Sequence, residues 1–505
     1  MPRLLSSLAV LGVLAPAVVA LPVATPRADA PHPVRPAVTH LALGPAATDL
    51  PGPALRRADD GLAPTGTRSF SMVGVTWRHD LGVGTVAVQV RWRSGRAWSD
   101  WHLLGGDSDD APDPRTGDSG PARRDGTAPL WVGHADGVQV RTTSSGVSPR
   151  DLRVELVDPG TSPADAAVGT VPRDSAAASE NQPSILTRAD WGADESIRRG
   201  SPSYSSTVKV GFVHHTDTAN DYTMAQTPSV IRSIYAYHVQ SNGWNDIGYN
   251  FLVDRFGRIW EGRYGGVTRA VVGAHTGGFN TDSFGTSLIG TFATVAPPAA
   301  TLTALEHLFA WKLGASYRDP LGRATLISAG GGYGPDPAGA PHTFQVISGH
   351  RDASYTSCPG DAAYARLGSI RTAVASYLGS AFTNPSASST RVPVGSTTPV
   401  TVTAGVRNAP AWTLAITTPA GATVRSWSGS AGQSVSASWD LTDASGAAVP
   451  VGPYLLTLSG QSADGDSALP WSTTVVVGSP QVPKGAWMSP RHYSTRFAPR
   501  PSPSP

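Results

Sequence analysis

Three side chains in the middle of the sequence are of the types that hold a metal ion: His214, His350 and Cys358. The chain has one cysteine, so Cys358 cannot form a disulfide within it. Imidazole nitrogen and thiolate sulfur are zinc ligands, and a hydrolytic zinc site uses three such ligands and leaves a fourth position open for water. Taken alone, such a histidine or cysteine more often has a structural role, the cysteine as a small buried apolar side chain. The surrounding sequence therefore has to decide between the two interpretations.

The candidate ligands follow segments with regular patterns. Residues 207–214 have the pattern of a strand that ends at the pair His214-His215. Residues 249–254 and 258–261 alternate as a hairpin. Helical spacing of apolar residues predicts helices over 228–241, over Leu302 to Leu313 and over 361–376, with His238 on the apolar face of the first. Because strands and helices interleave, we predict a mixed α/β domain over residues 184–378.

Short strand patterns separated by Gly, Asp and Pro lie on both sides of this domain, and each set predicts a β-sandwich. Stretches of Pro, Ala and Ser without hydrophobic periodicity predict disordered segments between them. The predicted order is a signal peptide 1–20, a disordered leader 21–65, a β-sandwich 66–159, a linker 160–183, the α/β domain 184–378, a linker 379–390, an immunoglobulin-like β-sandwich 391–478 and a disordered tail 479–505.

The net charge of the chain and its N-terminal segment limit which partners and which location we expect for the protein. With 39 basic and 37 acidic residues the net charge is +2, which gives no field that would attract nucleic acid. Arg3 is followed by the apolar run Leu4 to Ala20, which favours export; a membrane anchor is the alternative. We expect a secreted or wall-associated monomer with no stable membrane insertion once the signal is removed.

Several motifs around the candidate ligands occur in a fixed order. They are Phe212-Val213-His214-His215-Thr216, Trp244-Asn245-Asp246-Ile247-Gly248-Tyr249-Asn250-Phe251, Glu261-Gly262-Arg263, Gly273-Ala274-His275-Thr276, Asn280, Gly349-His350-Arg351-Asp352 and Thr356-Ser357-Cys358-Pro359-Gly360. Because of these motifs, the segment from about residue 185 to residue 378 resembles the peptidoglycan recognition and type 2 N-acetylmuramoyl-L-alanine amidase family. Near the C-terminus, Trp439-Asp440-Leu441, Gly446 and Val451-Gly452-Pro453-Tyr454 resemble the immunoglobulin-like domain of the flagellar hook-capping protein.

The family resemblance implies roles for individual residues. It implies zinc ligation by His214, His350 and Cys358, and catalytic roles for Tyr249 and Thr356. Family members that only bind peptidoglycan typically replace the cysteine, so its presence favours an enzyme. Recycling-type relatives have a glutamate where this chain has Ser287, so the resemblance assigns no general base. Four residues are candidates for substrate binding: His215, Arg263, His275 and Asn280. Alternation along the strand points His215 to the face opposite His214. A salt bridge within the domain is the alternative for Arg263, and structural support is the alternative for His275 and Asn280.

The resemblance implies a secreted, zinc-dependent amidase that hydrolyses the amide between the lactyl group of N-acetylmuramic acid and L-alanine of the peptidoglycan stem. Two alternatives stay open. One is a peptidoglycan-binding protein that keeps the amidase fold without activity. The other is a different zinc amide hydrolase, such as a carboxypeptidase, because zinc sites recur on unrelated folds.

Overall fold

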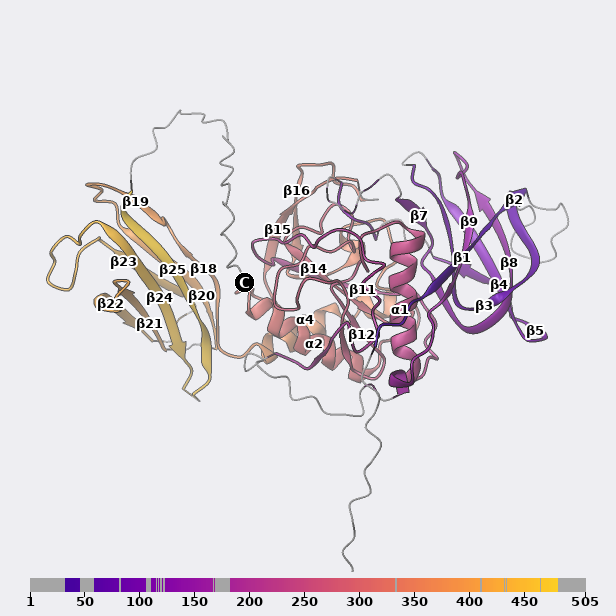
Figure 1. Ribbon diagram of the computed structural model, residues 1–505. Coiled ribbons are helices and arrows are strands. Elements are labelled where there is room, and N and C mark those ends of the chain that lie inside the picture. The colour runs from indigo at the N-terminus through magenta and orange to yellow at the C-terminus, as the bar shows by residue number, and fades with distance from the viewer. Residues whose placement is uncertain are drawn as a thin grey trace, which may run out of the picture.

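The computed structural model describes residues 32–45 and 59–479, with gaps at 81–82, 106–109, 115, 117, 119, 121–122, 167, 169–181, 332–333, 409–410, 431, 433 and 464. Along the chain a strand-rich domain, an α/β domain and a second strand-rich domain follow one another (Figure 1). The predicted signal peptide, most of the 160–183 linker and nearly all of the tail lie outside the described residues. No helix within the described ranges is long and apolar enough to cross a membrane.

The α/β domain is built on a mixed sheet of six strands in the order β10-β13-β12-β14-β11-β17. The strands are β10 (Ile185–Leu186), β13 (Ile259–Glu261), β12 (Phe251–Val253), β14 (Ser283–Leu288), β11 (Val210–His215) and β17 (Ile347–Gly349). Strand β11 runs parallel to both β14 and β17, so the carboxyl ends of these three strands share one edge of the sheet. A separate hairpin pairs β15 (Arg323–Ile327) with β16 (Pro341–Gln345).

Helices cover the two faces of this sheet (Figure 1). On one face α2 (Ala299–Gly314) and α4 (Leu367–Tyr377) bury apolar side chains against the sheet, for example Leu305 and Val374, and the short α3 (Asp361–Tyr364) precedes α4. On the other face lies α1 (Thr227–Ala236), which continues as a π-helical turn through Ser241. These elements confirm the first two predicted helices, the hairpin and the α/β arrangement. The single helix predicted over 361–376 is instead two helices, α3 and α4.

The N-terminal domain is one hydrogen-bonded sheet of nine strands. They are β1 (Ala37–Ala42), β2 (Gly44–Pro45), β3 (Asp60–Arg78), β4 (Val86–Ser94), β5 (Ala97–Trp98), β6 (His102–Leu104), β7 (Arg124–Gly126), β8 (Leu130–Ser144) and β9 (Arg153–Asp158). The register of β3 against β8 shifts at several points, which allows the two long strands to bend. A cluster of buried valines, with Phe70 and Trp77, forms the core of this domain.

Within the described residues, the predicted disordered leader 21–65 is wrong at Ala37–Pro45 and from Asp60 onward. Strand β1 pairs with β9 along its whole length, and β3 begins at Asp60. Because the partner of β1 lies more than a hundred residues later, local composition carries no sign of the pairing. The 160–183 linker also begins too early, since Pro163–Ala166 form a 3-10 turn against the α/β domain.

The N-terminal domain and the α/β domain share an apolar core. Met72, Trp131 and Val157 pack in the same buried cluster as Ile231 and Tyr235 of α1. Gly74 makes room for the ring of Tyr237, whose hydroxyl donates a hydrogen bond of 2.9 Å to the carbonyl of Thr127. A contact of this kind holds the two domains together more firmly than a polar interface would.

Arg232 adds a polar clamp to this interface. The side chain is 1% exposed and forms two hydrogen bonds, of 2.9 and 2.6 Å, with the carboxylate of Asp165. It also donates to the carbonyls of Pro159 and Trp191, so it ties the segment after β9 to the α/β domain.

Replacing this clamp is expected to destabilise the protein strongly. Arg232→Ala leaves Asp165 and the carbonyls without their donor, which costs about 3 kcal/mol and lowers the melting temperature by roughly 6 to 12 °C. Arg366→Ala, at an exposed position just before α4, is the control and should have almost no effect. Equal melting temperatures for the two variants in calorimetry would contradict the clamp.

The C-terminal domain consists of two sheets with an apolar core. One sheet contains β18 (Ala381–Ala387), β20 (Val400–Arg407) and β23 (Ser434–Trp439); the other contains β19 (Arg391–Pro393), β25 (Ser467–Ser479), β24 (Gly452–Gln461), β21 (Ala411–Thr417) and β22 (Thr423–Gly429). The predicted linker 379–390 is wrong, because β18 pairs with β20. Polar contacts join this domain to the centre, among them the ion pair of Arg407 with Asp319 at 3.0 Å.

Candidate metal centre

His214, His350 and Cys358 meet in one buried cluster. One ligand atom of each lies within 4.8 Å of the corresponding atoms of the other two, and all three side chains are buried. Sheet register explains the meeting of the two histidines: Val213 on β11 lies beside Gly349 on β17, so His214 and His350 follow at the same carboxyl edge. Cys358 reaches this edge from the loop that precedes α3. Two imidazoles and one thiol are a donor set that fits zinc.

The neighbours of the cluster orient its side chains. Nε2 of His214 lies 3.2 Å from Nδ1 of His275 and 3.3 Å from Oγ1 of Thr276, so its Nδ1 faces the cluster. Sγ of Cys358 accepts a hydrogen bond of 3.4 Å from the backbone N–H of His215. Outer contacts of this kind fix the ring orientation of metal-binding histidines. His275 therefore supports a ligand, and burial holds its pKa well below the usual value.

Tyr249 lies beside the cluster, as the sequence predicts. Its ring is 5.6 Å from the His214 ring, measured between centroids, and its hydroxyl is directed toward the same space.

Ser287 lies opposite His214 in the register of β14 and β11, and its hydroxyl has no hydrogen-bond partner among the described residues. Thr356 is half-buried, and its hydroxyl accepts a 3.2 Å hydrogen bond from the backbone N–H of Cys358. Thr356 thereby also shapes the cysteine loop.

A cavity opens beside the metal cluster. Its lining includes His350, Cys358, Thr356 and His215, and its empty volume is about 630 Å³. The cavity therefore borders two of the three candidate ligands, His350 and Cys358.

His215 and His238 have mainly structural contacts. Nδ1 of His215 accepts a hydrogen bond from the backbone N–H of Phe292, and burial lowers the His215 pKa. Nδ1 of His238 accepts one from Gly248, and burial lowers its pKa to about 3, which confirms the predicted core position. His215 also lines the cavity, so its predicted position beside the substrate stays a prediction.

Sequence reasoning missed three acidic residues in the connection between β6 and β7. Oδ1 of Asp110 lies 3.3 Å from Nδ1 of His214 and 3.1 Å from Nδ1 of His350. The other carboxylate oxygen of Asp110 accepts a 2.7 Å hydrogen bond from the hydroxyl of Tyr249. In the sequence, the only feature of this connection is that it is rich in Asp, Gly and Pro. Such a composition is typical of any exposed turn and does not indicate a site.

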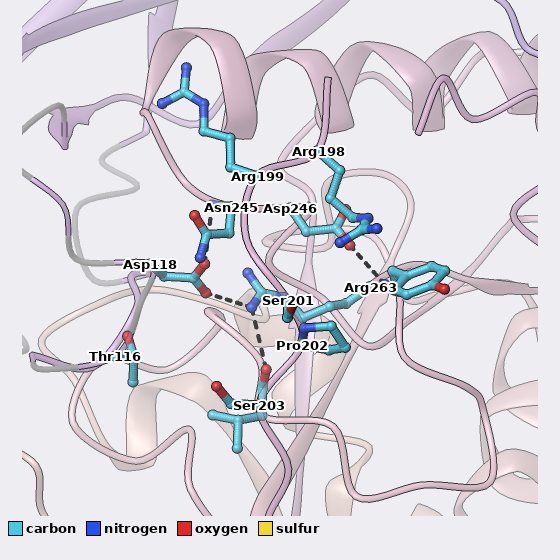
Figure 2. A pocket seen from close by; sticks show the side chains of 12 residues that line it. Thr116, Asp118, Arg198, Arg199, Ser201, Pro202, Ser203, Asn245, Asp246 and Arg263 are labelled. Atoms are coloured by element: carbon cyan, nitrogen blue, oxygen red, sulfur yellow. Dashed lines mark hydrogen bonds and ion pairs between the residues drawn. The ribbon is translucent and has the colours of Figure 1, made fainter. Parts of the chain in front are cut away.

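Two of the predicted substrate-binding residues contact the same connection. Asn280 donates hydrogen bonds of 2.9 Å to the carbonyl of Ala111 and of 2.7 Å to Asp113. Arg263 forms an ion pair of 2.5 Å with Asp118 (Figure 2). Burial raises the pKa of Asp113, and its hydrogen bonds from Asn280 and Gly278 oppose that rise. Arg263 and Asn280 are thus buried in contacts with the N-terminal domain.

Parts of the chain match known protein families and individual known proteins. Residues 204–361 match the N-acetylmuramoyl-L-alanine amidase family, and residues 30–181 match the Rv3811 N-terminal galactose-binding domain-like family. The peptidoglycan-recognition protein SC2 of Drosophila simulans is 32% identical over 178 residues, which are 35% of this chain and 80% of that protein. The human N-acetylmuramoyl-L-alanine amidase is 32% identical over 36% of this chain and 27% of that protein.

Two solved structures are similar to part of this chain. Drosophila PGRP-LB is 29% identical over 37% of this chain and 93% of its own, with a TM-score of 0.29. Drosophila peptidoglycan recognition protein LE, crystallised with tracheal cytotoxin, is also 29% identical, over 37% of this chain and 92% of its own, with a TM-score of 0.29. With the six-stranded α/β domain and its motifs in place, the chain belongs to the family of peptidoglycan recognition proteins and N-acetylmuramoyl-L-alanine amidases.

Proposed function

We propose that the protein is a zinc-dependent N-acetylmuramoyl-L-alanine amidase, which hydrolyses the bond between the lactyl group of N-acetylmuramic acid and L-alanine of the stem peptide. The observation that carries the proposal is the buried meeting of His214, His350 and Cys358 next to Tyr249 and an open cavity. Recognition of peptidoglycan alone needs no such set of ligands. The family to which the chain belongs supports the choice of substrate.

The zinc ion, held by the two imidazoles and the thiolate, would supply Lewis-acid activation of water and of the amide carbonyl. The protein supplies the rest. His275 and Thr276 hold the His214 ring, and the backbone N–H of His215 holds the sulfur of Cys358, so the ligands need no rearrangement when metal binds. The buried surroundings strengthen every electrostatic interaction in the site.

Tyr249 is the chain's hydrogen-bond donor for the reaction. Its hydroxyl already donates to a carboxylate oxygen beside the ligands, so it is oriented to donate to an oxyanion that develops there. Thr356, at the rim of the same cavity, is the second candidate donor, because its hydroxyl proton is not used in the bond that it accepts from Cys358. Together the two hydroxyls would stabilise the negative charge that forms on the amide oxygen.

We also propose that the protein acts outside the cell, at the wall. The apolar run Leu4 to Ala20 supports export, and peptidoglycan is an extracytoplasmic substrate.

Product analysis tests the proposed reaction. The full chain is incubated with soluble disaccharide tetrapeptide, and the products are separated and weighed by mass spectrometry. We expect a free tetrapeptide with an N-terminal alanine and a peptide-free disaccharide, and neither product with Cys358→Ser. Release of a C-terminal amino acid would indicate a carboxypeptidase instead, and intact muropeptide that stays bound would indicate a recognition protein.

A further inference from the structure

A short segment of the N-terminal domain lies inside the candidate active site. We call it the plug and define it as residues 110–114 with Thr116 and Asp118, which are described residues of the connection between β6 and β7. Asp110, Asp113 and Asp118 are 4%, 1% and 6% exposed, and Ala111 is 2% exposed. Three carboxylates from an otherwise polar loop are thus buried in another domain, which is costly unless each has a partner there.

Asp110 lies where a fourth metal ligand would lie. Two atoms bound to one tetrahedral zinc ion, each at about 2.0 to 2.1 Å, are about 3.3 Å apart. Oδ1 of Asp110 lies 3.3 and 3.1 Å from the Nδ1 atoms of His214 and His350, so it is at the distance that a ligand of the same ion would have. The position it takes is the one that a hydrolytic site keeps for water.

Asp110 also accepts the hydrogen bond of the Tyr249 hydroxyl, which is the proposed donor for the reaction. The Tyr249 hydroxyl donates its proton to Oδ2 of Asp110 at 2.7 Å. A carboxylate that acted as general base would have to leave room for substrate between itself and this tyrosine. Here it fills that room, which argues for a blocking role.

The rest of the plug engages polar groups beside the site. The carbonyl of Ala111 and the carboxylate of Asp113 accept both protons of the Asn280 amide. The backbone N–H of Gly278 also donates to Asp113, at 2.9 Å. Asp118 accepts from Arg263 and, at 3.1 Å, from the backbone N–H of Asn245, and Figure 2 shows its carboxylate facing the guanidinium. Carboxylates and a peptide carbonyl are the groups that a stem peptide would present to the same donors.

From these contacts we infer that the chain folds as a latent amidase, with Asp110 as fourth ligand of the metal and the plug in the groove that a stem peptide would occupy. This inference rests on the proposed function. The enzyme becomes active when the plug is displaced, so that water replaces the Asp110 carboxylate and substrate replaces Ala111, Asp113 and Asp118.

Incomplete pairing favours such displacement. Within the described residues, Oδ2 of Asp113 and Nη2 of Arg263 are buried without a hydrogen-bond partner. A buried polar atom without a partner costs about 1 to 3 kcal/mol. The plug therefore binds its groove less tightly than a fully paired segment, and a ligand that pairs these atoms can compete with it.

The full chain carrying Asp110→Ala tests the inference by two independent measurements. The first replaces zinc by cobalt(II), whose visible spectrum reports its ligands, and adds azide as a small anionic ligand. We expect azide to leave the wild-type spectrum unchanged and to shift the Asp110→Ala spectrum, because only the variant has an open position. The second measures kcat/KM on the soluble muropeptide, which we expect to rise at least about tenfold in Asp110→Ala.

Asp100→Ala is the matched control, because Asp100 is an exposed aspartate of the same domain outside the plug. It should behave as wild type in both measurements. Melting temperatures of all three proteins show whether the variants are folded. Asp118→Asn, which weakens the far end of the plug without touching the metal, should raise kcat/KM in the same direction.

The outcomes separate this inference from the proposed function. An azide-sensitive spectrum in Asp110→Ala alone, with no hydrolysis by any variant, supports the plug and overturns the amidase. If azide shifts the wild-type spectrum, the metal already has an open position. The inference that Asp110 fills this position is then wrong, whatever the activity. A fall of kcat/KM in Asp110→Ala also overturns it, because Asp110 would then take part in the reaction.

Discussion

His350→Ala and Cys358→Ser are each expected to abolish hydrolysis and to leave the purified protein with no more than roughly a tenth of an equivalent of zinc. Each change removes one of three buried ligand atoms that lie within 4.8 Å of one another. Serine does not replace the cysteine, because its hydroxyl stays protonated at neutral pH whereas a metal-bound thiol is deprotonated. Atomic emission spectrometry after dialysis gives the zinc content, and muropeptide hydrolysis gives the activity.

The control for this prediction is His307→Ala. His307 is an exposed histidine on α2 that stacks on Tyr377, away from the site. It should keep about one zinc per chain and full activity. A His350→Ala protein that retains both would show that the metal, if any, is held elsewhere.

Tyr249→Phe is expected to lower kcat by about 10²-fold or more, with little change in zinc content. Phenylalanine keeps the ring, which is 3% exposed and packs in the shared core, and deletes only the hydroxyl. An interaction made mainly in the transition state lowers kcat and kcat/KM together and leaves substrate affinity nearly unchanged. Turnover is therefore compared at saturating muropeptide.

Because Tyr249 also holds Asp110, the comparison is made in two backgrounds. Tyr249→Phe in the Asp110→Ala protein reports the role of the hydroxyl in the reaction without its role in the plug. Thr356→Val in the same background should have a smaller effect. Wild-type turnover for Tyr249→Phe, at an unchanged melting temperature, would mean that the hydroxyl does not stabilise the oxyanion.

Much of the α/β domain could be predicted because its signals are local. The strand pattern that ends at the pair His214-His215 and the helical spacing in residues 228–241 both correspond to elements of the sheet and its cover. The boundaries of the flanking domains could not be predicted in this way. Strands β1 and β18 have compositions typical of linkers, and they form because β9 and β20 offer them unpaired backbone groups.

The candidate site was likewise predicted only in part. The family motifs identified His214, His350, Cys358 and Tyr249 as site residues, and the structure places these four side chains close together. The position of Asp110 could not be predicted, because the residues that surround it follow more than a hundred positions later and belong to another domain. A loop of aspartates, glycines and prolines has no periodicity that indicates which surface it will contact.

Hydrolysis in ¹⁸O-labelled water tests the central claim most directly. An N-acetylmuramoyl-L-alanine amidase adds one oxygen from water to the lactyl group, and the amine of L-alanine leaves with the peptide. We therefore predict that mass spectrometry finds one ¹⁸O atom in the lactyl carboxylate of the disaccharide product and none in the released peptide. Label in a carboxylate of the peptide, or no labelled product from the wild type and the Asp110→Ala protein alike, would contradict the account.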